Sequence, residues 1–187
     1  MIAAPVEHLD LATVIAISQS VSGEMVLEKL LDTLMRTAVK HAGAERAFLV
    51  LSRKTEQRIA AKATIIGDTV MVHLCDEPVT RFALPEAVLR HVSHTRENVI
   101  LDDAVDQNPF SQDVYIAERH PRSVFCLPLM NQAKFIGALY LENYRAPRAF
   151  ARARKGVLKL LASQAASRSK TDVCIAISRN VNRESDA

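Results

Sequence analysis

The segment from Arg122 to Tyr144 has the densest apolar pattern of the chain. It predicts two strands, Ser123–Met130 and Phe135–Glu142, joined by a polar turn over residues 131–134. Apolar side chains occupy both faces of each strand, whereas a hairpin with one face in water alternates polar and apolar residues. We therefore expect this hairpin to be covered on both sides, which indicates a sensor or ligand-binding α/β module.

Alternation along the second strand separates its side chains into two sets. Phe135, Leu139 and Leu141 are expected on one face, opposite Ile136, Ala138 and Tyr140 on the other. Gly137 lies between them and lacks a side chain, so another group can approach the strand closely at this point.

Periodicity predicts the remaining elements. Apolar residues at helical spacing predict helices over Leu9–Ser20, Glu24–His41, Pro85–His94 and Phe150–Ser167. Shorter apolar runs predict strands over Ala47–Leu51, Arg58–Ile66, Thr69–Leu74 and Asn98–Leu101. A long loop over residues 102–121 follows, with a helical turn near Asp113–Arg119. We expect one hairpin face to border a cavity that the Pro85–His94 helix and this loop close.

The two terminal helices carry more apolar surface than one sheet contact needs. The arc of Phe150–Ser167 spans about 200°, and Leu9–Ser20 is short and mostly apolar. Exposed together they would form a large hydrophobic patch. We therefore expect a parallel homodimer that buries Leu11 and Ile15 with Leu158 and Leu161.

Composition places the chain among ordinary globular proteins. It has 187 residues, 49% hydrophobic and 24% charged, with a formal net charge of +3. No apolar run reaches the roughly 18–20 residues that span a bilayer, and the N-terminus lacks the pattern of a secretory signal. The three cysteines are widely spaced and odd in number. We expect a reduced cytoplasmic protein with no membrane partner.

Positive charge gathers between Arg145 and Arg183, where Phe150 is the only aromatic residue. Nucleic-acid surfaces usually pair a basic stripe with stacking aromatic side chains or a recognisable module. We therefore interpret this charge as a solvated helix face and expect no nucleic-acid partner.

Motifs for catalysis and metal binding are missing from the sequence. No Gly-rich phosphate loop and no Gly-x-Ser-x-Gly elbow occurs, so we expect no kinase, ATPase or hydrolase activity and no catalytic residue. His91 and His94 have a spacing that metal ligands can use, but no third ligand follows at a recognisable spacing. Asp102 and Asp103 suit a turn better than an acid pair, although one could still face the cavity.

Four segments resemble a GAF domain: HAGAERA at residues 41–47, VILDDA at 99–104 leading to Asn108-Pro109-Phe110, RSVFCLPL at 122–129 and IGALYLEN at 136–143. The resemblance covers roughly Leu9 to Ala166, and it is greatest to the GAF module of bacterial multidomain sensor histidine kinases. It implies an α+β fold, a GAF/PAS-like antiparallel sheet of about six strands with helices on both sides. We expect a single domain over residues 1–168 and a disordered tail over residues 169–187.

The resemblance also implies where a ligand binds. In GAF modules the loop corresponding to residues 102–121 lines the ligand site, and we take Asp103, Asn108, Phe110 and Tyr115 as candidates there. Val88, Cys126 and Gly137, on the helix and hairpin around the expected cavity, complete the candidate pocket. No cofactor is identified by the sequence.

The expected function is that of a non-catalytic sensory or regulatory module. It binds a small ligand or relays a signal through a helical dimer in bacterial signal transduction, because the catalytic core of those kinases has no counterpart here. One alternative is a small redox enzyme like the GAF-fold methionine sulfoxide reductase, but residues 84–121 contain no cysteine, and Cys126 suits a buried strand. Another is a purely structural dimerisation domain.

Overall fold

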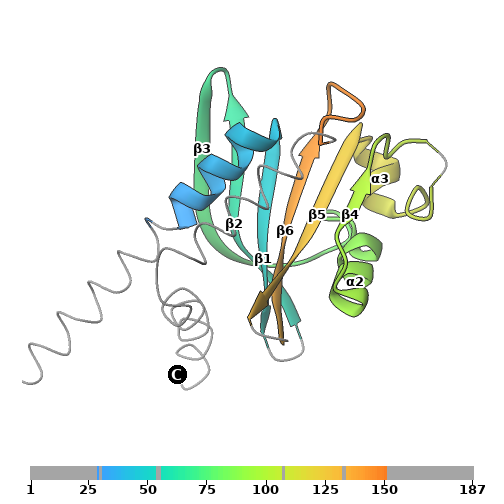
Figure 1. Ribbon diagram of the computed structural model, residues 1–187, viewed down its shortest axis with the longest axis horizontal. Helices are drawn as coiled ribbons and strands as arrows, with labels where there is room; N and C mark the ends of the chain where they lie inside the picture. The colour runs from blue at the N-terminus through green and yellow to red at the C-terminus, as the bar shows by residue number, and fades with distance from the viewer. Residues whose placement is uncertain (1–28, 30, 54–55, 107, 132–133, 151–187) are drawn as a thin grey trace, which may run out of the picture.

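The computed structural model describes residues 29, 31–53, 56–106, 108–131 and 134–150 (Figure 1). Six strands form one sheet in the order β3-β2-β1-β6-β5-β4, and each neighbouring pair is antiparallel. Their bounds are Arg46–Arg53 for β1, Glu56–Ile66 for β2, Thr69–Pro78 for β3, Val99–Leu101 for β4, Ser123–Asn131 for β5 and Lys134–Asn143 for β6. The predicted antiparallel sheet is confirmed.

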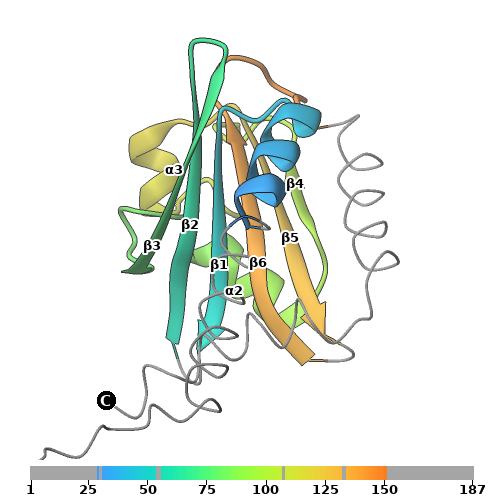
Figure 2. The ribbon, with the colours of Figure 1, turned by 90° about the vertical axis from the view of Figure 1, so that its left-hand side faces the viewer.

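Helices cover both faces of this sheet, as Figure 2 shows from the side. The helix over residues 31–42 packs on one face and contributes Met35, Ala38 and Val39 to its apolar layer. On the other face lie α2, Glu86–Thr95, and α3, Val114–Arg119. The sheet is therefore the middle of three layers, with two separate hydrophobic clusters.

The hairpin β5–β6 contributes to both clusters, which confirms that its two faces are covered. Leu127 and Leu139 pack toward the helix over residues 31–42, and Cys126 and Tyr140 pack toward α2 and α3. The expected alternation is wrong at Phe135, which packs in the cluster beneath α2 and α3 instead of with Leu139. A register shift beside Met130 pairs that residue with Phe135 and breaks the alternation.

The observed elements differ from the predicted ones mainly at their ends. Pro85 is the N-cap of α2, and Asp113 is the N-cap of α3. β3 continues past Leu74 to Pro78. This part of the strand includes Asp76 and Glu77, so the hydrophobic pattern does not predict it. The predicted helices Leu9–Ser20 and Phe150–Ser167 lie almost entirely outside the described residues, as do the dimer residues Leu11, Ile15, Leu158 and Leu161.

Gly137 allows β1 and β6 to pair closely. It lies opposite Leu51 in the ladder, and a Cβ atom added at Gly137 would overlap the carbonyl oxygen of Val50 and lie 3.1 Å from Leu51 Cα. Because these atoms belong to the backbone of a central strand, they cannot turn aside. The group that approaches this glycine is therefore the neighbouring strand.

We predict that Gly137→Ala lowers the free energy of unfolding by roughly 3 kcal/mol, because two central strands must separate to admit a methyl group. Urea unfolding measures the loss. Gly67→Ala is the control, since its added Cβ would meet nothing within 4 Å and should cost only the strain of a positive φ, about 1 kcal/mol. Equal losses in the two variants would contradict this role of Gly137.

Candidate functional site

Glu142 is a fully buried carboxylate in the core of the sheet. A carboxylate in such a place must be paired and hydrogen-bonded. The Tyr115 hydroxyl lies 2.9 Å from each of its oxygens, and the hydroxyls of Tyr140 and Tyr144 donate to it at 3.1 and 2.9 Å. One guanidinium nitrogen of Arg46 lies 3.0 Å from Oε1. We call these five residues the Glu142 cluster.

The sheet register places these groups together. Arg46 is the first residue of β1 and lies directly opposite Glu142 on β6, and Tyr140 is two residues earlier on the same face. The ring of Tyr115, from α3, packs edge-on against Tyr140 with centroids 6.4 Å apart. The cluster therefore joins two central strands and α3.

Asp113 links α3 to α2. Its Oδ1 accepts a hydrogen bond from the backbone N–H of Tyr115 at 3.0 Å, which caps α3. Its Oδ2 accepts one from the backbone N–H of Ala87 at 2.8 Å, in the first turn of α2. A single carboxylate thus satisfies an N-terminal donor of each helix.

Burial dominates the electrostatics of the Glu142 cluster. Burial raises the pKa of Glu142, although the charge of Arg46 and the three phenol hydroxyls act in the opposite direction. Burial and the neighbouring carboxylate raise the pKa of Tyr115, Tyr140 and Tyr144. The phenols therefore stay protonated at neutral pH and act as hydrogen-bond donors.

The cluster is suited to holding segments together. Each of its acceptor oxygens already has donors, and the tyrosines are too basic to ionise near neutral pH. Within the described ranges, no group of three or more His, Cys, Asp or Glu side chains could hold a metal ion. Nor is any helix in the described part of the chain long and apolar enough to cross a membrane.

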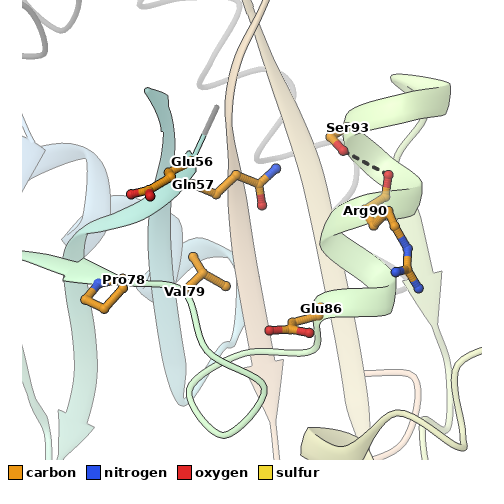
Figure 3. Close-up of a pocket in the computed structure, with 7 residues that line it drawn as sticks. All are labelled: Glu56, Gln57, Pro78, Val79, Glu86, Arg90 and Ser93. Atoms are coloured by element: carbon orange, nitrogen blue, oxygen red, sulfur yellow. Dashed lines mark hydrogen bonds between the residues drawn. The ribbon is translucent and has the colours of Figure 1, made fainter. Parts of the chain in front are cut away.

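A solvent-open cavity of about 500 Å³ lies between α2 and the ends of β2 and β3 (Figure 3). Its lining residues are Glu56, Gln57, Pro78, Val79, Glu86, Arg90 and Ser93. Figure 3 shows Gln57 and Glu86 pointing into the gap between strand and helix, with Val79 between them, whereas Arg90 points away. The Ser93 hydroxyl donates to the Arg90 carbonyl at 2.9 Å. We call this space the α2 cavity.

The predicted pocket residues fall into two groups, and none of them lines the α2 cavity. Val88 on α2, Tyr115 on α3 and Cys126 on β5 are buried between these helices and the sheet. Gly137 faces the β1 backbone. Side chains of α2 and α3 therefore cover the hairpin face that was expected to border a cavity.

The other predicted residues lie in the 102–121 segment. Asp103 forms an ion pair with Arg122 at 2.6 Å. Asn108 accepts a hydrogen bond from the Phe110 backbone N–H at 2.8 Å, and the Phe110 ring packs edge-on against His91. Ligand contact by any of the seven candidates stays a prediction.

Glu142 and Arg46 were not among the candidates from the sequence, although a signal for them exists. Glu142 ends an apolar run whose two faces are both covered, so its charge requires buried partners. Arg46 precedes the apolar run of β1 in a similar way. An acid and a base at the ends of two buried strands are candidates for a cross-strand ion pair.

We predict that Glu142→Gln lowers the free energy of unfolding by roughly 2 kcal/mol, because buried phenol donors lose an acceptor. The folded-state pKa of Glu142 is raised above its ordinary value of 4.5. Its contribution to stability is therefore complete below that value and declines as the pH rises through the raised pKa. Glutamine does not titrate, so the cost of the substitution should be larger at acidic than at neutral pH.

Urea unfolding at several pH values tests this, with the exposed α3 residue Glu118→Gln as the control. A cost that grows toward neutral pH would contradict the predicted sign.

Comparison with known proteins gives relatives among histidine kinases of eukaryotes. Histidine protein kinase 1 of Candida albicans is 30% identical over 138 residues, which cover 72% of this chain and 6% of that protein. Hybrid signal transduction histidine kinase G of Dictyostelium discoideum is 21% identical over 259 residues, 87% of this chain and 8% of that protein. The chain thus spans less than a tenth of the length of these relatives, which are eukaryotic rather than bacterial.

Solved structures share the fold. A GAF domain/HD domain protein from Geobacter sulfurreducens superposes with a TM-score of 0.56 at 14% identity, covering 80% of this chain and 93% of that one. The GAF domain of an Acinetobacter phosphoenolpyruvate-protein phosphotransferase gives 0.52 at 16% identity, with 87% and 93% covered. The GAF domain family itself matches residues 26–168. The chain therefore belongs to the GAF domain family.

Proposed function

We propose that this GAF domain is a non-catalytic sensory or regulatory module of a larger signalling protein, and that a small ligand binds in the α2 cavity. The similarity to short parts of histidine kinases supports a signalling role. The α2 cavity is the observation that carries the ligand proposal, because its volume of about 500 Å³ suits a small molecule.

The lining of the α2 cavity indicates the class of ligand. The Glu86 carboxylate accepts hydrogen bonds, the Gln57 amide both donates and accepts them, and Pro78 and Val79 add an apolar wall. The Arg90 guanidinium points away from the α2 cavity (Figure 3). The groups that point into the cavity are therefore mostly hydrogen-bond acceptors. A small molecule with an amine or amide donor and a short apolar part fits this surface best.

We predict that a fragment library of small amines and amides contains binders that shift the backbone amide resonances of Gln57, Val79 and Ala87. Ser93→Phe should abolish these shifts, because the new side chain occupies the cavity. His94→Phe is the matched control on the same helix, at a position that does not line the cavity. Shifts that survive in the Ser93 variant would place the ligand elsewhere.

A second candidate is a domain that relays signals without a ligand. The packed face of the hairpin favours it, because Cys126, Ala138 and Tyr140 are covered by side chains of the protein itself. In this case the signal passes through a parallel dimer of the terminal helices. A change in the upstream segment would then shift the dimer between two arrangements.

We predict a homodimer at micromolar concentration that Leu158→Glu combined with Leu161→Glu converts to monomer, because both charges would enter the apolar helix pairing. Sedimentation measures the change. Lys155→Glu with Lys159→Glu is the control on the polar side of the same predicted helix. A monomeric wild-type domain would remove this candidate.

The thiol groups argue against the redox alternative. Cys126 is fully buried, and burial raises its pKa. Burial also raises the pKa of Cys75, whose Sγ lies 3.4 Å from the Ile59 carbonyl oxygen. Thiol catalysis needs an accessible thiolate with a lowered pKa, and neither of these described cysteines has one.

A further inference from the structure

The α3 segment, residues 108–121, is held to the sheet by few side chains. Tyr115 and Ile116 are the buried residues of α3, and its other four residues are exposed. A helix of six residues has little stability of its own. The position of this segment therefore depends mainly on Tyr115, Ile116 and the capping residue Asp113, with further packing from Phe110 and Pro121.

Tyr115 makes the polar contact with the sheet. Its hydroxyl lies 2.9 Å from both oxygens of Glu142, and its backbone N–H is bound by Asp113, which also holds the Ala87 N–H of α2. Undocking of Tyr115 would leave the buried carboxylate with fewer donors and would disturb the start of α2. The Tyr115–Glu142 contact therefore holds α3 to the sheet, and through Asp113 it is also connected to α2.

We propose that α3 is a latch: the Tyr115–Glu142 contact fastens residues 108–121 over the sheet, and its release lets this segment open as a unit while the six strands stay folded. Opening uncovers Tyr140 and the Glu142 carboxylate. The carboxylate then offers a hydrogen-bond acceptor to an incoming molecule, and the Tyr140 ring offers an apolar wall. The latch needs no ligand in the α2 cavity, so it does not depend on the function proposed above.

Tyr144 makes a matched control possible. Its hydroxyl donates to the same carboxylate at 2.9 Å, but Tyr144 follows β6 and lies outside the α3 segment. Removing either hydroxyl takes one donor from Glu142. The two variants therefore disturb the same acid, but only Tyr115→Phe removes the bond between α3 and Glu142.

Amide hydrogen exchange, followed residue by residue by NMR, tests the proposal. The reporters in α3 are Ala117 and His120, whose N–H groups donate to the carbonyls of Asp113 and Ile116. Ala87 reports on α2, and Leu139, paired with Leu49 at the centre of the sheet, reports on global unfolding. Tyr115→Phe should speed exchange at Ala117, His120 and Ala87 by about tenfold, as expected for losing a hydrogen bond to a charged group.

Exchange at Leu139 should rise by a similar factor in Tyr115→Phe, because global unfolding breaks the same contact. Tyr144→Phe should speed exchange at Leu139 and leave the α3 reporters near their wild-type rates, because the Tyr144 contact stays intact while only α3 opens. Equal acceleration of Leu139 and Ala117 by Tyr144→Phe would show that only global unfolding exposes α3 and would overturn the proposal. Equal acceleration of α3 by both variants, or by neither, would overturn it as well.

The unmodified protein gives a test that does not rely on a variant. In native-state exchange at increasing urea, opening of the latch exposes less surface than global unfolding, so exchange at Ala117 and His120 should depend less steeply on urea. Leu139 should show the full dependence of global unfolding. A shared dependence at all three amides would overturn the latch.

Discussion

Burial of the Glu142 carboxylate is the constraint that organises one end of the domain. Removing this charge from water is costly unless donors surround it, and the donors come from β1, α3, β6 and the residue after β6. A β-sheet by itself supplies only backbone partners. The side chains that complete the site therefore set how α3 sits on the sheet and how the chain leaves β6.

The rest of the fold follows from the covering of a central hairpin on both faces. β5 and β6 place Leu127 and Leu139 in one hydrophobic cluster, and Cys126 and Tyr140 in the other. Each cluster needs its own helical layer. The helix over residues 31–42 supplies one, and α2 with α3 supplies the second.

The sequence predicts this architecture well because strands that are covered on both faces carry apolar residues at consecutive positions. This pattern can be recognised from a short stretch of sequence. It fails where a feature depends on register or on partners distant in the chain. Phe135 changes face because of an irregularity beside Met130 that no hydrophobic pattern shows. The α2 cavity lies between segments far apart in sequence, and its polar lining from Gln57 and Glu86 resembles ordinary surface composition. The Tyr115 donor of Glu142 was hidden for the same reason, since it is 27 residues away.

The segment that enters β1 and the segment that leaves β6 are tied to each other by hydrogen bonds. The Asn143 side chain donates to the carbonyl of Gly43, where the helix over residues 31–42 ends, and the backbone N–H of Tyr144 donates to Glu45. Entry and exit of the chain therefore share one corner of the sheet. A displacement of the helix over residues 31–42 would therefore act directly on the segment that leaves β6, with no change needed in the strands between them.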